Sequence, residues 1–218
     1  MKANAEKFGA KIILNTTANI DLVKSYSPYA VIVATGAAAV KPRSIKGVEN
    51  KNVFTTTEIL SGAVKLSGKR VAIIGSGLTG LETAELLVET GNKITVVEMA
   101  DKIAPGTWFQ LTDDILPKLE KFDTKYIVSH KLNSIDETGI TIEPVKLGKD
   151  KKPVSIGNEK HLDFDAVVLS LGSRPVNNLM KEFEGQFENL YAIGDAGKIG
   201  RIVDATATAY DIALHKIK

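Results

Sequence analysis

Short apolar runs alternate along the chain with stretches whose apolar residues recur at every third or fourth position. Residues 70–74 form one such run, with the length and composition of a strand buried on both faces of a parallel sheet. The next stretch has helical spacing and ends at the helix stop Gly91; its apolar positions are Leu78, Leu81, Ala84 and Val88. A second apolar run follows at 93–98. This pattern predicts a strand–helix–strand unit of about 30 residues, the size of one half of a doubly wound sheet.

The segment beyond residue 100 adds a helix and a hairpin. Residues 113–122 predict a helix with Thr112 as its cap, in which Pro117 indicates either a kink or a later start. Residues 132–135 (Leu-Asn-Ser-Ile) and 140–143 (Ile-Thr-Ile-Glu) flank a short turn that ends in glycine, and this arrangement predicts a β-hairpin.

Three more apolar runs have a glycine at or near their end. They span residues 29–36, 165–172 and 190–195, and a helical pattern from Val203 to the C-terminus follows the last of them. The alternation of strands and helices predicts an α/β fold with mostly parallel sheets.

Composition narrows the choice of partners. The 218 residues suffice for one large domain or two small ones, and the formal charge of +2 gives no reason to expect nucleic acid or an anionic membrane as partner. The N-terminus has no apolar core of the signal-peptide kind, and the longest apolar stretch, at 30–40, is too short to span a bilayer. We therefore expect a cytoplasmic protein.

The chain contains no cysteine, so it holds no thiolate nucleophile, disulfide, iron–sulfur cluster or cysteine-bound zinc. Its histidines, His130, His161 and His215, lack the spacing of metal ligands, and we interpret them as surface or structural residues. Any redox chemistry therefore requires a bound organic cofactor.

A glycine motif, Gly75-x-Gly77-x-x-Gly80, lies where the first predicted strand meets the helix. In a dinucleotide-binding turn the first glycine makes the tight turn, the second lets backbone approach a pyrophosphate, and the third brings helix and strand together. The backbone N–H groups from Ser76 to Thr79 are then expected to face the phosphates. The alternative is a glycine-rich turn without a ligand. The candidate nucleotide-binding residues are Gly75, Ser76, Gly77, Leu78, Thr79 and Gly80.

Glu98 favours the interpretation with a ligand. It closes the second predicted strand 18 residues after Gly80, where a carboxylate accepts hydrogen bonds from ribose hydroxyls. A carboxylate there also repels a 2′-phosphate, so NAD is favoured over NADP, although Lys102 partly offsets the repulsion.

Four motifs in a fixed order carry a family resemblance. They lie at residues 31–36 (Val-Ile-Val-Ala-Thr-Gly), at 71–84 around the glycine motif, at 167–175 (Val-Val-Leu-Ser-Leu-Gly-Ser-Arg-Pro) and at 190–195 (Leu-Tyr-Ala-Ile-Gly-Asp). This order resembles that of the FAD-dependent pyridine nucleotide oxidoreductases. The ending Gly200-Arg-Ile-Val-Asp-Ala205 is similar to the C-terminal region of old yellow enzyme-type NADH:flavin oxidoreductases, such as 2-enoate and 2,4-dienoyl-CoA reductases.

The resemblance implies a fold and a cofactor role for individual residues. A Rossmann-like three-layer NAD-binding domain at 66–175 is expected inside a partial FAD-binding Rossmann-like domain at 1–65 and 176–218. Glu82 matches a position near the nicotinamide, and Gly172 one that lines the nucleotide groove. The residues matched to FAD are Thr35, Gly36, Gly194, Asp195, Arg201, Ile202 and Val203. Of these, Asp195 matches an acid that hydrogen-bonds the ribityl chain, with a helix-capping aspartate as the alternative.

The chain departs from the family pattern in having a single GxGxxG motif, the one matched to NAD. The family's separate fingerprint for the FAD pyrophosphate has no counterpart, nor do the FMN barrel and the cluster cysteines. We therefore expect a fragment whose partners include the remainder of its parent enzyme. The strand at 30–34 is expected to have an open edge that favours self-association, unless residues 11–14 fill the vacant position.

Three functions are open at this point. The first is an oxidoreductase module that holds NADH at the glycine motif for hydride transfer to FAD, which needs no protein acid or base. The second is an NAD-binding module without turnover, because FAD cannot be held. The third is a self-contained NAD-dependent dehydrogenase, which requires a proton-transfer residue that no His, Tyr or Lys spacing reveals.

Overall fold

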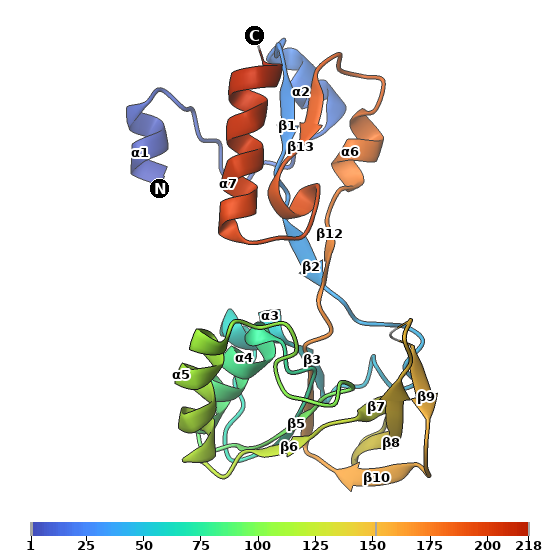
Figure 1. The fold of residues 1–218 in the computed structure, drawn as a ribbon. Helices are drawn as coiled ribbons and strands as arrows, with labels where there is room; N and C mark the ends of the chain where they lie inside the picture. Colours follow the sequence, from blue (N-terminus) through green and yellow to red (C-terminus); the bar gives the residue numbers. More distant parts are fainter. Residues whose placement is uncertain (1, 151, 218) are drawn as a thin grey trace. The chain divides into compact units, whose positions relative to one another are not determined.

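The computed structural model describes residues 2–150 and 152–217, and the chain divides into two compact units. Unit 1 consists of Met1–Ala38 and Pro175–Lys218, and unit 2 of Ala39–Arg174 (Figure 1). Unit 2 is thus inserted into the sequence of unit 1.

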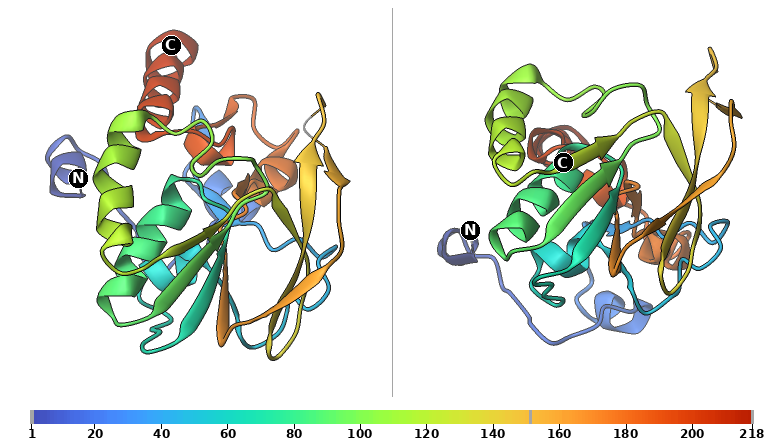
Figure 2. Two further views of the ribbon diagram at one scale, coloured as in Figure 1. Left: turned by 60° about the horizontal axis from the view of Figure 1, so that its bottom comes forward. Right: turned by 90° about the horizontal axis from the view of Figure 1, so that it is seen from below.

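A five-stranded parallel sheet forms the centre of unit 2 (Figures 1 and 2). Successive side chains of its middle strand enter two different cores: Val71 and Ile73 belong to one, and Ala72 and Ile74 to the other. Because both faces of the sheet are covered, its central strands are mostly apolar, as the sequence predicts. In spatial order the strands are β3 (Val53–Thr55), β11 (Ala166–Leu169), β4 (Arg70–Ile74), β5 (Lys93–Val97) and β6 (Lys125–Ile127).

Helices cover one face of this sheet and a second, antiparallel sheet covers the other (Figure 2). The helices are α3 (Thr56–Leu60), α4 (Leu78–Glu89) and α5 (Phe109–Glu120). The antiparallel strands are β7 (His130–Ile135), β8 (Gly139–Leu147), β9 (Pro153–Ser155) and β10 (Lys160–Asp163). Unit 2 is therefore a three-layer structure, and the expected Rossmann-like α/β class is confirmed.

Two details of unit 2 bear on the sequence predictions. The expected hairpin exists, since β7 and β8 pair antiparallel. The expected helix start is wrong: α5 begins at Phe109 with Trp108 as its N-cap residue, and the Thr112 hydroxyl donates to the Phe109 carbonyl inside the helix. Pro117 lies within α5, where burial of Ile115 and Leu119 on the sheet side stabilises the helix on both sides of the proline.

The expected first domain boundary is also wrong. Residues 39–65 belong to unit 2, because β3 pairs with β11 and extends the parallel sheet, and α3 follows it directly. The insert therefore begins near Ala39, not at residue 66, while its end at Arg174 lies one residue from the expected position.

Unit 1 has a small core. Its central strands, β1 (Val31–Val33) and β13 (Leu190–Ala192), pair in parallel. Only Val33, Phe183 and Ala196 are fully buried in this core among the described residues. The helices of unit 1 are α1 (Lys2–Lys7), α2 (Ile20–Ser25), α6 (Asn178–Phe183) and α7 (Ile202–Asp211), with short turns η1 (Gly194–Ala196) and η2 (Ile212–Lys216). The connecting strands β2 (Ala37–Ala39) and β12 (Ser173–Pro175) pair with each other.

The sheet of unit 1 has an open edge at β1. Within residues 2–150 and 152–217, β13 is the sole strand that pairs with β1. Residues 11–14 do not fill the vacant position, since they are not in a strand and Ile12, Ile13 and Leu14 are exposed. On α7, Ile202 and Val203 are exposed as well, Ile202 to 85%. Unit 1 thus leaves much apolar surface uncovered.

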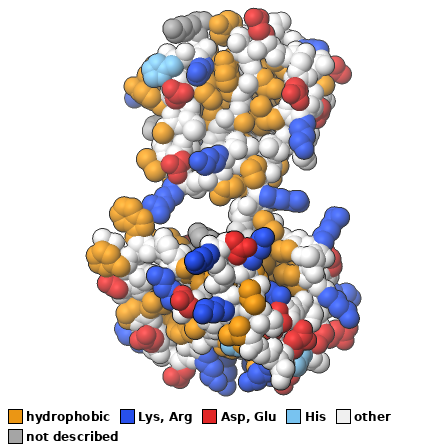
Figure 3. Space-filling model, turned by 45° about the vertical axis from the view of Figure 1, so that its right-hand side comes forward, with side chains coloured by type: hydrophobic (Ala, Val, Ile, Leu, Met, Phe, Trp, Pro, Cys, Tyr) orange, Lys and Arg blue, Asp and Glu red, His pale blue; other side chains and the backbone are white. Residues whose placement is uncertain are grey.

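Charged side chains of both signs are interspersed on the face drawn in Figure 3. That face shows no extended positively charged patch of the kind that attracts polyanions. Among the described helices, none combines the length and apolar character needed to cross a bilayer.

The difference between the cores predicts a difference in local stability. We expect faster amide hydrogen exchange in residues 2–38 and 175–217 than in 70–97, because few buried contacts hold unit 1 together. Hydrogen-exchange mass spectrometry on the whole chain measures both regions at once. Equal protection of β1 and β4 would contradict this prediction.

Candidate functional site

The three glycines of the motif have different surroundings. A Cβ on Gly75, whose φ is +100°, would lie 2.4 Å from the Ser170 carbonyl oxygen. A Cβ on Gly80 would lie 2.4 Å from the carbonyl oxygen of Gly75. A Cβ on Gly77 would have no atom within 4 Å. The first and third glycines therefore permit close packing, whereas the second leaves space beside the start of α4 for a ligand.

The N-terminus of α4 provides backbone donors at this space. Gly77 is its N-cap residue, and no described side chain caps the helix. The N–H groups of Gly80 and Leu81 donate to the Gly77 carbonyl, so Leu78 and Thr79 supply the first N–H groups of the helix that are free to bind an anion. The expectation for Ser76 is wrong, because its N–H donates to Glu98 Oε2 at 2.9 Å and does not face the ligand space.

Glu98 is held in place by three donors. Its Oε2 accepts from the Ser76 N–H and, at 2.7 Å, from the Ser76 hydroxyl. Its Oε1 accepts from the Ala100 N–H at 2.8 Å. The carboxylate thus lies against the glycine turn at the end of β5, as the spacing predicts.

A cavity of about 290 Å³ opens at this edge of the sheet. Gly75, Ser76, Gly77 and Glu98 line it. Other strands bring further residues to the same edge that were not predicted as site residues: Ser170 after β11, and His130, Lys131 and Leu132 from β7. Strand order in a parallel sheet could have located Ser170, because the carboxyl ends of β4 and β11 meet at one edge.

Two of these residues, His130 and Lys131, already interact with other groups of the protein. Lys131 Nζ lies 2.6 Å from Glu143 Oε1, and this hydrogen bond lowers the pKa of Glu143. His130 Nδ1 lies 2.7 Å from the Val128 carbonyl oxygen, which can only accept, so we assign the ring proton to Nδ1. His130 Nε2 is then an acceptor.

Glu82, Gly172 and Lys102 do not line this cavity. Glu82 is exposed on α4, beyond its first turn, and Gly172 is exposed with a φ of +82° and no atom near its Cβ position. The expected positions of Glu82 near the nicotinamide, of Gly172 in the nucleotide groove and of Lys102 near the ribose therefore stay predictions.

Unit 1 gathers most of the residues matched to FAD around a second cavity, of about 330 Å³. Asp195 accepts a hydrogen bond from the Gly200 N–H at 3.0 Å, in the loop before α7. The helix-capping alternative for Asp195 is wrong, because Asp204 accepts the N–H of Arg201, the N-cap residue of α7. The matched residues that line the cavity are Gly36, Gly194, Asp195, Arg201 and Ile202, whereas Thr35 and Val203 do not line it.

Thr35 has a structural contact instead: its hydroxyl donates to the Val176 carbonyl. The two segments that make up unit 1 are thereby joined next to Gly36. Sequence alone gives no sign of this bond, since its partners lie far apart along the chain.

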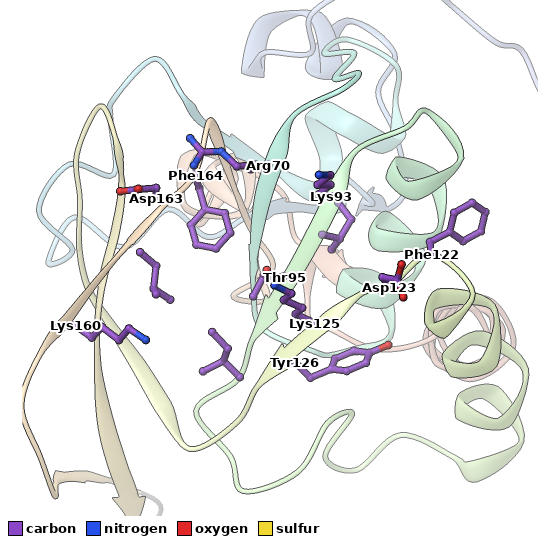
Figure 4. A pocket seen from close by; sticks show the side chains of 13 residues that line it. Arg70, Lys93, Thr95, Phe122, Asp123, Lys125, Tyr126, Lys160, Asp163 and Phe164 are labelled. Carbon is purple, nitrogen blue, oxygen red and sulfur yellow. The ribbon is translucent and has the colours of Figure 1, made fainter.

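A larger cavity, of about 860 Å³, lies at the opposite, amino-terminal ends of β4, β5 and β6 (Figure 4). Its lysines, Lys93, Lys125 and Lys160, stand at separate points around it, and Asp123 and Asp163 share the rim. Its lining includes none of the predicted site residues. Among the described residues no group of three His, Asp or Glu side chains is placed to bind a metal. The glycine-motif edge is therefore the better candidate site.

Arg70 at this rim is neutralised by a neighbour. Its guanidinium donates to Asp165 Oδ1 at 2.8 Å, and hydrogen bonds from Arg70 lower the pKa of Asp165 to about 2. Arg70 thus ties β4 to the start of β11 and is not free to bind a ligand.

Comparison with known proteins now decides the family. The family model described as pyridine nucleotide-disulphide oxidoreductase matches residues 6–209. The chain belongs to this family. It has no cysteine and so contributes no redox disulphide to the chemistry of the family.

Several proteins that resemble this chain are longer than it is. An NADH oxidase of Thermoanaerobacter brockii is 33% identical over 98% of this chain and 32% of its own length. A metal reductase of Desulforamulus reducens is 32% identical over 84% of this chain and 30% of its own. A solved structure of 2-naphthoyl-CoA reductase has a TM-score of 0.83 and 28% identity over 98% of this chain and 31% of its own. The chain thus spans about a third of the length of these relatives.

The surroundings of the glycines predict which substitutions the fold tolerates. We expect Gly75→Ala and Gly80→Ala each to lower the free energy of unfolding by about 1–3 kcal/mol, because the new Cβ meets backbone carbonyl oxygens. Gly77→Ala, with open space and a φ of −58°, is expected to change it by no more than about 0.5 kcal/mol. Urea unfolding of the three variants measures their free energies of unfolding and tests whether Gly77→Ala is the most stable of them. A Gly77→Ala variant as unstable as Gly80→Ala would contradict it.

Proposed function

We propose that this chain binds NAD(H) at the glycine motif and aligns it for hydride transfer to FAD, as part of a flavin-dependent NADH oxidoreductase. The observation that carries the proposal is the open space at Gly77, between the uncapped start of α4 and the Glu98 carboxylate. When bound, the two cofactors supply the chemistry, a hydride passing from nicotinamide C4 to flavin N5.

The residues of the chain bind and orient. The N–H groups of Leu78 and Thr79 donate to the pyrophosphate at the positive end of the α4 dipole, and Gly77 lets it approach the backbone. Glu98 Oε1 accepts from a ribose hydroxyl. Glu82 and Gly172 are proposed to line the path of the nicotinamide, in keeping with the family resemblance.

The charges of the cavity support a preference for NAD over NADP. Glu98 repels a 2′-phosphate. Among the described residues that line the cavity, Lys131 is the one permanent cation, and Glu143 already neutralises it. Lys102, the residue expected to offset the repulsion, is not part of the lining.

Unit 1 is proposed as part of the FAD site. Gly36, Gly194 and Asp195 surround one cavity there, and Arg201, Ile202 and Val203 lie at the start of α7 beside it. Asp195 is matched to the ribityl chain, and Thr35 holds the turn that carries Gly36. Unit 2 then corresponds to the NAD-binding insert. The ending at residues 200–205 supports membership of the old yellow enzyme-type subgroup.

One of the longer relatives is named for the oxidation of NADH, and two are named as reductases, one of a metal and the other of 2-naphthoyl-CoA. We therefore propose that this chain serves the donor half of such reactions, the part that takes electrons from NADH. A second candidate is an NAD-binding module without turnover. It is favoured by the single glycine fingerprint and by the uncovered edge of unit 1.

The NAD assignment predicts a measurable preference. In calorimetric titrations we expect NADH to bind at least about tenfold more tightly than NADPH. Gly77→Val should abolish binding of both, because its side chain occupies the pyrophosphate space. Glu98→Gln should weaken NADH binding and reduce the preference for NADH over NADPH. Glu89→Gln, at the far end of α4, is the control and should leave both affinities unchanged. Equal or tighter binding of NADPH by the unaltered chain would defeat the assignment.

The single glycine motif and the unpaired edge of β1 predict the behaviour of the purified chain. We expect little or no bound FAD and negligible NADH oxidase activity, because no second glycine turn is present to hold the FAD pyrophosphate. The same chain should sediment as more than one copy, since β1 offers an unpaired edge. Absorbance near the flavin bands after dialysis, together with sedimentation velocity, tests both. A yellow protein with stoichiometric FAD and NADH oxidase activity would rule out the module without turnover.

A further inference from the structure

Ser76 joins three segments of unit 2 through one fully buried side chain. It occupies the variable position between the first two glycines of the motif and is 0% exposed. Its hydroxyl donates to Glu98 Oε2 at 2.7 Å and accepts from the Ala104 N–H at 2.9 Å. The glycine turn, the end of β5 and the loop at residue 104 therefore meet at a single oxygen atom.

These bonds determine what Glu98 can still accept. Each carboxylate oxygen accepts about two hydrogen bonds. Oε2 has two donors, both from Ser76, and Oε1 has one, the Ala100 N–H. One accepting direction is left, on Oε1. The carboxylate is thus fixed in orientation and presents one oxygen to a ligand.

Loss of the Ser76 hydroxyl would also remove the hydrogen bond that the Ala104 N–H donates to it, and this would destabilise the folded chain. Ala104 is buried and has a φ of +53°, a backbone conformation that alanine rarely adopts. Without the Ser76 oxygen its N–H would be buried and unpaired, which destabilises that arrangement of the loop. The hydroxyl therefore holds both Glu98 and the chain that follows β5.

We propose that Ser76 is a positioning residue for cofactor choice: its hydroxyl holds Glu98 so that one carboxylate oxygen meets the ribose and its charge excludes a 2′-phosphate. The inference rests on the proposed NAD(H) site and deepens it, because it assigns selectivity to a residue whose N–H and hydroxyl already bond within the protein. Glu98 acts on the ligand, and Ser76 acts through Glu98.

The test is a double-mutant cycle on the whole chain, with NADH and NADPH as probes. We expect Ser76→Ala to weaken NADH binding about tenfold and to reduce the NADH/NADPH affinity ratio several-fold, because the carboxylate is no longer fixed. In a Glu98→Gln background Ser76→Ala should leave that ratio unchanged. Thr83→Ala is the matched control: Thr83 is also 0% exposed and its hydroxyl bonds the Thr79 carbonyl within α4, away from Glu98.

A measurement without ligand separates the positioning role from general destabilisation. Amide exchange around residues 100–104 should rise in Ser76→Ala and stay unchanged in Thr83→Ala at equal global stability. If Ser76→Ala does not fold, Ser76→Cys keeps the size of the side chain with a weaker donor, and the same shifts are expected at smaller amplitude.

The outcomes distinguish the two proposals. If the unaltered chain binds neither NADH nor NADPH, the proposed function fails and this inference falls with it. If it prefers NADH and Ser76→Ala or Ser76→Cys leaves the affinity ratio unchanged, the inference is overturned while the NAD site stands. The inference would also be overturned if Ser76→Ala changed the NADH/NADPH affinity ratio by the same factor in the unaltered chain and in the Glu98→Gln variant.

Discussion

The close approach of α4 to the ends of β4 and β11 is the contact on which the candidate site depends. At Gly75 and Gly80 the backbone lies so near the Ser170 and Gly75 carbonyl oxygens that no side chain fits. This proximity places the first turn of α4 directly at the carboxyl edge of the sheet. It also brings Ser76 within reach of Glu98, since the glycine turn and the end of β5 are then neighbours. Unpaired backbone N–H groups and a carboxylate thereby occupy one edge.

Much of unit 2 could be predicted because its signals are local. The run at 70–74, the helical spacing after it and the run at 93–98 each correspond to an element, and the glycines and Glu98 lie where their spacing places them. Burial on both faces makes such strands easy to recognise, because most of their residues are apolar. The start of α5 was harder, since Trp108 caps the helix without the polar side chain that marks most helix starts.

The features that could not be predicted depend on contacts between residues far apart in the sequence. His130 and Lys131 reach the cavity through the antiparallel sheet, and no motif in the sequence marks them. The direction of the Ser76 N–H was missed because a helix N-terminus suggests free donors, whereas a carboxylate 22 residues away accepts this one. The first boundary of the insert was missed because β3 joins the sheet by pairing with β11, which lies more than a hundred residues further along the chain.

The inserted arrangement also has a consequence for the order of folding. In unit 1, Val31 pairs with Leu190, so its central ladder closes a loop of more than 150 residues. Such a closure is slow and entropically costly when the intervening chain is unfolded. Unit 2 holds its own two ends together, because the Val40 N–H donates to the Gly172 carbonyl at 3.0 Å. Once unit 2 has folded, the two halves of unit 1 start from neighbouring points. The inserted unit 2 is thus also a template that shortens the search by which the outer unit assembles.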